Sequence, residues 1–167
     1  MAECHIVAAD RIAHILNVYT HVEWPLDIES VDQIIHELGW TRIPHTSRIK
    51  VVTDFPTNDT STSFLKENGV VKEIDCYVSD SLFGEPDLSP VKEAYKSVWA
   101  VVSSVLGKRG GGRSGDSWWD LPTGGRVHVK NLSTVVALDL LSREYADIER
   151  GEARYGISPN RVLGQDE

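Results

Sequence analysis

Residues 60–79 read TSTSFLKENGVVKEIDCYVS and contain the clearest strand signal of the chain. Two runs that alternate between apolar and polar residues, Thr60–Lys66 and Val70–Ser79, lie on either side of Asn68-Gly69. Asn-Gly tolerates positive φ at both central positions of a two-residue loop, so the stretch predicts a β-hairpin with a type I′ turn. Because the apolar residues of the second run alternate with polar ones, we expect a sheet with one buried and one solvated face.

Four more segments predict strands of the same sheet. The first of them alternates, with Ile49, Val51 and Thr53 on one face. The second and third are joined by the turn sequence of residues 122–125, which contains one proline and two glycines. With the hairpin, these segments make about six strands. Their ranges are 48–54, 118–121, 126–131 and 134–141.

Four segments predict helices, because apolar residues recur every three or four positions or because capping residues bound them. Asp10 and Asp27 are the expected N-caps of the first two helices, and Gly39 ends the second. Ser89 is the expected cap of the third helix, with Pro90 in its first turn. The expected helices run from Asp10 to Trp24 and over 28–38, 89–106 and 142–154.

The order of these elements is two helices, three strands, one helix, three strands and one helix. Strands and helices do not alternate, which argues against a parallel Rossmann-type sheet. We therefore predict an α+β fold with a single antiparallel sheet of about six strands, packed by helices mainly on one face. It forms one domain over residues 1–167, with a flexible Gly-rich arm at 107–116 and a mobile tail from about residue 158.

The composition is that of a folded, acidic protein. Of 167 residues, 41% are hydrophobic and 25% are charged, and the net charge is −8. A protein that binds nucleic-acid phosphates needs basic residues over a whole face, so we expect no nucleic acid partner. No run reaches the ~20 apolar residues of a membrane span, so we expect no membrane association. Cys4 and Cys76 make no disulfide framework, which favours the cytoplasm.

Residues 107–116 carry the densest positive charge of the chain. The segment contains five glycines together with Lys108, Arg109 and Arg113. A phosphate-binding loop has the order GxxxxGK[ST] between a strand and a helix, whereas here Lys108 precedes the glycines and follows a helix. Two interpretations stay open: the segment is a flexible connector, or it is an arm that becomes ordered against a partner.

Two adjacent tryptophans, Trp118 and Trp119, follow the arm on a predicted strand. Neighbouring residues of a strand point to opposite faces, so one ring joins the core and the other is exposed or covered. An exposed tryptophan beside a basic arm fits a protein interface, because Trp and Arg are enriched at binding hot spots.

No assembled catalytic or metal-binding signature stands out in the sequence. His14 and His21 are seven residues apart, which does not fit the i, i+4 spacing of a helical zinc site. The GxSxG motif of a nucleophilic serine is absent. Glu73 and Asp75 share the outward face of one strand and fit either acid–base chemistry or an acidic patch. We expect no enzyme activity, no metal and no cofactor.

Five short motifs of the chain are Glu37-Leu38-Gly39-Trp40, Val70–Asp80, Val105-Leu106-Gly107, Trp118–Leu121 and Val135–Leu140. Their order resembles that of the actinobacterial immunity proteins encoded beside secreted polymorphic toxins. The likeness extends over most of the chain, and within that group it is to immunity factors of NAD-hydrolysing toxins.

This resemblance implies a cytoplasmic antitoxin that forms a 1:1 heterodimer with its cognate toxin, such as an NAD glycohydrolase, and occludes the active-site cleft of that enzyme. The arginines of the arm would occupy the phosphate subsite of a nucleotide cleft or pair with catalytic carboxylates. The alternatives are a small enzyme and a structural interaction domain with no inhibitory role. The expected partner-binding residues are Lys108, Arg109, Gly110, Gly111, Gly112, Arg113, Asp116, Trp118 and Trp119.

Overall fold

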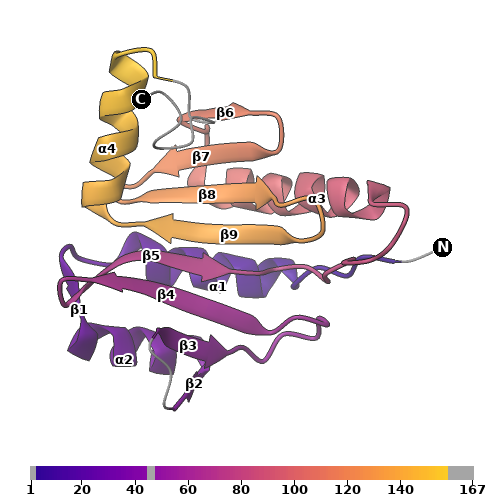
Figure 1. The fold of residues 1–167 in the computed structure, drawn as a ribbon, viewed down its shortest axis with the longest axis horizontal. Helices are drawn as coiled ribbons and strands as arrows, with labels where there is room; N and C mark the ends of the chain where they lie inside the picture. The colour runs from indigo at the N-terminus through magenta and orange to yellow at the C-terminus, as the bar shows by residue number, and fades with distance from the viewer. Residues whose placement is uncertain (1–2, 45–47, 158–167) are drawn as a thin grey trace, which may run out of the picture.

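The computed structural model describes residues 3–44 and 48–157, so the tail expected from about residue 158 lies outside the described residues. Within this part the chain forms four helices and one sheet (Figure 1). The helices are α1 (Ala9–Thr20), α2 (Ile28–Leu38), α3 (Ser89–Leu106) and α4 (Arg143–Arg154). The strands are β1 (Leu26–Asp27), β2 (Thr41–Ile43), β3 (Ile49–Val52), β4 (Ser61–Glu67), β5 (Val70–Cys76), β6 (Gly111–Arg113), β7 (Asp116–Asp120), β8 (Arg126–Asn131) and β9 (Val136–Leu141).

The sheet is a single antiparallel one, as predicted, but it has nine strands and not about six. The strand order is β2-β3-β4-β5-β9-β8-β7-β6, and β1 pairs with β5 off this path. The six predicted strands are β3, β4, β5, β7, β8 and β9. The three additional strands, β1, β2 and β6, have two or three residues each, which is too short to show an alternating pattern in a sequence.

The hairpin of β4 and β5 has the predicted turn. Asn68 has φ 53° and Gly69 has φ 80°, the two positive values that a type I′ turn requires. The pairing shifts register between Leu65 and Lys66, as at a β-bulge. Beyond the shift, Ile74 and Cys76 point into the core, while Glu73 and Asp75 point to the opposite face.

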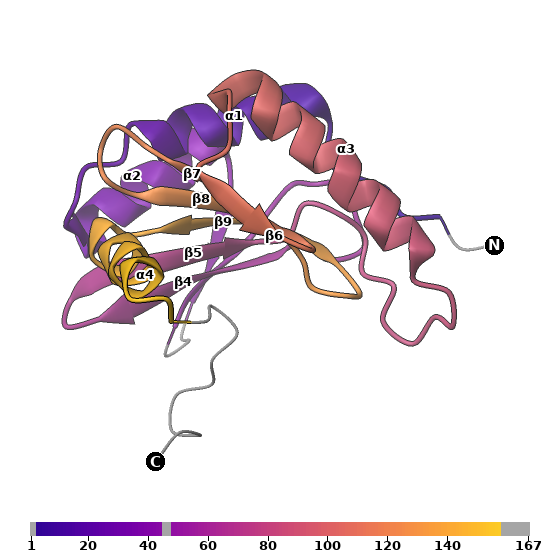
Figure 2. The same cartoon turned by 90° about the horizontal axis from the view of Figure 1, so that it is seen from above.

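Three helices cover one face of the sheet and α4 lies at one end of the other (Figure 2). The core lies between the sheet and α1, α2 and α3. Its largest fully buried side chains include Tyr19, Phe64, Leu138 and Trp119. We call the opposite side, on which α4 lies, the helix-poor face. No described helix is long and apolar enough to cross a membrane.

The helix ends only partly follow the predicted caps. Asp27 caps α2 by accepting a hydrogen bond from the Ser30 backbone N–H at 2.8 Å, and Gly39 ends that helix with φ 71°. The predictions for Asp10 and Ser89 are wrong, because both residues lie inside the first turn of their helices. In each case the residue before the helix makes no side-chain cap.

Candidate functional site

Charged side chains gather on the helix-poor face, along the strands β7, β8, β9 and β5. The period-two alternation of these strands places every second side chain there. The contributing residues are Asp116, Trp118 and Asp120 of β7, Arg126, His128 and Lys130 of β8, Asp139 of β9, and Glu73 and Asp75 of β5. They form two groups, one centred on His128 and one on Asp139.

His128 lies between two carboxylates. Its Nδ1 is 2.7 Å from Asp116 Oδ1, and its Nε2 is 2.8 Å from Glu149 Oε1 on α4. Burial lowers the pKa of His128, but the hydrogen bonds to Asp116 and Glu149 outweigh it and raise the pKa above the ordinary 6.5. The charged imidazolium can donate through both nitrogens, so it fits this position better than the neutral ring does.

Arg126 extends the same group of charges. Its Nε donates to Asp120 Oδ1 at 2.9 Å, and its Nη1 donates to Glu149 Oε1 at 3.2 Å. Arg150 of α4 reaches the same Asp120 oxygen at 2.7 Å. The Arg126 guanidinium carbon also lies 5.5 Å from the centre of the Trp118 ring, within the range of a cation–π contact. These charges therefore tie α4 to β7 and β8.

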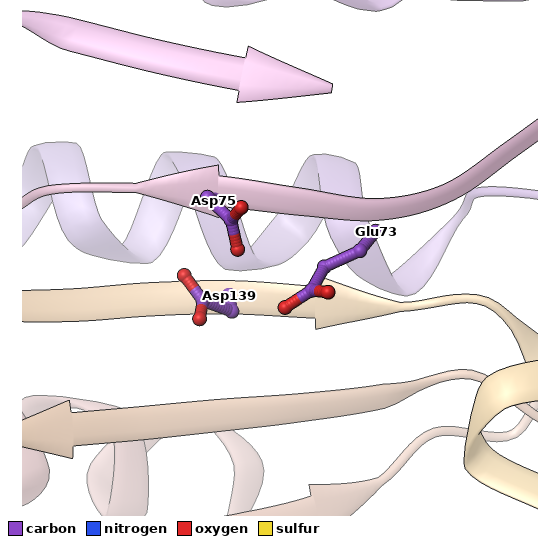
Figure 3. Close-up of side chains that lie close together, drawn as sticks. All are labelled: Glu73, Asp75 and Asp139. Carbon is purple, nitrogen blue, oxygen red and sulfur yellow. The ribbon is translucent and has the colours of Figure 1, made fainter. Parts of the chain in front are cut away.

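The second group contains three carboxylates, from Glu73, Asp75 and Asp139 (Figure 3). One oxygen from each lies within 4.8 Å of the others. Asp139 also accepts a hydrogen bond from the Cys76 backbone N–H at 3.3 Å. The Lys130 ammonium lies 3.4 Å from Asp139 Oδ2 and 3.9 Å from Glu73 Oε1. Lys130 therefore supplies a counter-charge inside a cluster that would otherwise repel itself.

This crowding keeps protons on the cluster. Burial, together with the neighbouring Asp75, raises the pKa of Glu73 to about 8. Burial also raises the pKa of Asp139 to about 7, although Lys130 opposes the shift. Groups with such values exchange protons near neutral pH, which is what general acid–base chemistry needs. Three carboxylates of this kind also suit Ca²⁺ or Mg²⁺, but Lys130 already balances part of their charge.

The structure orders part of the segment that the sequence predicts to be a flexible arm. Residues 111–113 form β6, the edge strand beside β7. Lys108 and Arg109 precede it and are exposed, and Arg109 Nη1 donates to Ser117 Oγ at 3.0 Å. Arg113 Nη2 lies 3.0 Å from Asp116 Oδ2. Backbone pairing with β7 and these two side-chain contacts explain the order.

One glycine of this edge, Gly111, is required by close packing and not by an unusual φ angle. A Cβ on Gly111 would lie 2.7 Å from atoms of the Trp118 indole ring. A Cβ on Gly112 would meet the end of the exposed Arg109 side chain, which is flexible and can move aside. Gly111 thus lets an aromatic ring lie directly against the backbone of β6.

The two tryptophans lie on opposite faces of β7, as predicted. Trp119 is 1% exposed, stacks at a tilt on Trp99 of α3, and donates from Nε1 to the Gly107 carbonyl at 3.0 Å. Trp118 is half-buried on the helix-poor face, with its ring 5.6 Å from that of His128. Trp119 and Asp116, which is 5% exposed, lie inside the protein. Trp118 and the basic residues remain at the surface.

A groove of about 480 Å³ lies between α4 and the edge formed by β6, β7 and β8. Trp118 and the side chains of four arginines line it, namely Arg113, Arg126, Arg150 and Arg154. The backbone at Gly110 also borders it. The predicted arm and Trp118 therefore meet at one groove, whereas Trp119 belongs to the core.

His128, Lys130, Asp139 and Glu149 are members of the site that the sequence pattern does not predict. The alternation of Arg126, His128 and Lys130 along one strand is a signal that could have marked a polar face. Asp139 and Glu149 give no such signal, because their role depends on which strand and which helix pack beside them.

Comparisons with curated proteins and with solved structures give no match to the chain. A comparison with protein families matches residues 10–142, from the first helix to the residue that caps α4, to a family of unknown function, DUF6301. Because that match covers most of the chain, the protein belongs to the DUF6301 family.

Proposed function

We propose that this protein is an immunity-type binding protein that inhibits a cognate toxin enzyme by occluding its active-site cleft. The observation that carries the proposal is the exposed pair Lys108 and Arg109, which precedes β6, the terminal strand of the sheet path. This edge combines positive charge with backbone groups that no other described strand pairs with on the outer side.

The order of the edge favours tight binding. A ten-residue flexible arm would lose about 1–2 kcal/mol per residue in backbone entropy on becoming fixed. In the folded protein, β6 and its contacts to β7 have already fixed much of the segment. A partner would therefore meet a preorganised surface, and preorganisation raises affinity by lowering the entropic cost of binding.

The chemistry of the edge suits an acidic cleft or an extended strand. Arg109 and Lys108 can pair with the carboxylates of an enzyme site. The free side of β6 can accept a strand from the partner, as in other complexes built by strand addition. Trp118 and the arginines of the adjacent groove are residue types that dominate binding at interfaces.

A charge-reversal experiment tests the proposal. Lys108→Glu with Arg109→Glu should weaken capture of the partner at least tenfold while lowering the unfolding midpoint only slightly, because Lys108 is exposed and Arg109 loses one hydrogen bond, to Ser117. The matched control is Lys66→Glu on β4 with Lys92→Glu on α3, which makes the same change of charge at exposed positions that do not border the hollow beside Arg109. Equal capture by both pairs would contradict the proposal.

One observation favours a second candidate, a small acid–base enzyme. Glu73 and Asp139 have pKa values raised to about 8 and about 7 on the helix-poor face. Perturbed carboxylates of this kind cluster at catalytic sites, although structural charge networks produce them too. The test is to incubate wild type and Glu73→Gln with host metabolites. Consumption of a metabolite by wild type alone would favour the enzyme over the inhibitor.

A further inference from the structure

The helix α4 packs on the sheet with little apolar contact. Of its residues Arg143–Arg154, Ala146 is the buried one. Ile148, its largest aliphatic side chain, is 51% exposed. Most helices are held in place by an apolar face against the core, so another interaction must keep α4 in position.

Ion pairs provide that interaction, through Arg150 with Asp120 and through two carboxylates of α4. Glu144 pairs with Lys72, and Glu149 pairs with both Arg126 and His128. The three cations belong to β5 and β8, and their side chains are 9%, 7% and 3% exposed respectively. We call Lys72, Arg126 and His128 the cationic strip. Carboxylates of α4 pair with all three cations, and Asp120 and Asp116 of β7 also pair with Arg126 and His128.

The family match covers the cationic strip but not α4. All three residues of the strip lie within residues 10–142, which match the DUF6301 family, whereas α4 begins at Arg143. The part of the chain that matches the family therefore contains the surface, and its covering helix follows that part.

Hollows flank α4 on both sides. One, of about 550 Å³, lies between α4 and Trp24, Pro25 and the start of β5, and Ile148 borders it. The other is the 480 Å³ groove with Trp118 and the arginines. A helix with larger apolar residues beside its carboxylates would bury surface in these hollows that α4 leaves uncovered.

We propose that the cationic strip is a docking surface for an acidic amphipathic helix of the partner protein, and that α4 is an intramolecular occupant that this helix displaces. The proposal rests on the proposed function in that the partner is the same inhibited enzyme. The cationic strip would recognise two carboxylates five positions apart on the partner helix, as Glu144 and Glu149 are in α4. Apolar side chains next to these carboxylates would enter the flanking hollows.

A peptide-binding experiment on the full chain tests this docking surface. The probe is a synthetic peptide with the sequence of residues 142–155, and the host is the full chain with Glu144→Gln and Glu149→Gln, which weakens the intramolecular contact. Glu152→Gln is the matched control chain, because Glu152 borders the groove without pairing to the strip. A peptide with glutamine at both carboxylate positions is the matched control probe.

We expect the peptide to bind the doubly substituted chain at least tenfold more tightly than the control chain, and the glutamine peptide to bind at least tenfold more weakly. Amide hydrogen exchange should show faster exchange in α4 of the substituted chain and unchanged protection in β8 and β9, which verifies the fold. Equal binding to both chains, or unchanged exchange in α4, would overturn the proposal. The capture experiment on Lys108 and Arg109 is independent of this result, so each proposal can fail alone.

Discussion

At the scale of single residues, His128, Glu73 and Asp139 hold protons more tightly in the folded protein than in the unfolded chain. The pKa of His128 lies above 6.5, that of Glu73 is raised from 4.5 to about 8, and that of Asp139 is raised from 3.8 to about 7. A group whose pKa is raised by folding stabilises the folded protein at low pH. This stabilisation is lost as the pH rises through the pKa that the group has in the folded protein. The opposite holds for Glu149, whose pKa is lowered by His128 despite burial.

These directions predict how stability depends on pH. The free energy of unfolding should fall as the pH rises from about 5 to about 8, because in that range the unfolded chain has released the protons of Glu73 and Asp139 while the folded protein still holds them. Urea unfolding at constant ionic strength measures it. Glu73→Gln should flatten the curve up to about pH 8, since glutamine does not titrate. A wild-type curve that rises over this range would contradict the assignment of protons to the cluster.

The close approach of Trp118 to β6 gives a second prediction. Gly111→Ala should destabilise the protein by about 1–3 kcal/mol, the usual cost of overpacking, because the new methyl would lie 2.7 Å from the indole ring. Gly151→Ala is the control, since a Cβ there meets nothing within 4 Å and the residue lies inside α4. It should stabilise by up to about 1 kcal/mol. Urea midpoints for the two variants that shift in the same direction would show that packing at Gly111 is not tight.

The role of a residue was predictable where local backbone geometry determines it. It was not predictable where tertiary contacts determine it. The turn at Asn68-Gly69 and the opposite faces of Trp118 and Trp119 follow from local geometry. The order of the segment around Gly111 does not, because it depends on the ring of Trp118 packing against that glycine. In a sequence, glycine indicates a flexible backbone, whereas in the structure Gly111 permits close contact with the Trp118 ring.

At the scale of elements, the cap of α4 should control how firmly this helix is seated. Ser142 Oγ accepts a hydrogen bond from the Tyr145 backbone N–H at 3.2 Å. Ser142→Ala should destabilise α4 by about 1 kcal/mol, as for other N-caps, and should speed amide exchange in α4 roughly fivefold. Ser97→Ala, in the interior of α3, should have little effect on exchange in either helix, since alanine favours helix interiors. Equal exchange in α4 of wild type and Ser142→Ala would show that the cap does not limit its opening.

Elements were predictable in proportion to their length. The sequence predicts all four helices and the six longer strands, and the structure contains each of them, but the first helix ends at Thr20 and not at Trp24 as predicted. The strands β1, β2 and β6 exist because a neighbouring strand pairs with them. The position of α4 on the helix-poor face was not predictable either, because ion pairs with Lys72, Arg126 and His128 hold it there.

At the scale of the whole molecule, an acidic protein presents a basic edge. The net charge is −8, yet Lys108 and Arg109 are exposed next to Gly110, which borders a groove lined by four arginines and by the two carboxylates of Glu149 and Glu152. Such a separation of charge orients a protein as it approaches a partner and is weakened by salt. The association rate of the partner, measured by surface plasmon resonance, should therefore fall several-fold when the ionic strength is raised from low to physiological. A rate independent of salt would place the interface away from this edge.

Inhibition of the partner enzyme is measured by titrating the activity of the captured partner with the purified protein. We expect the activity to fall linearly and to reach near zero at one equivalent, as for a tight 1:1 complex. Partner activity that persists in the presence of excess protein, although the two remain bound, would show that the protein binds the enzyme without inhibiting it.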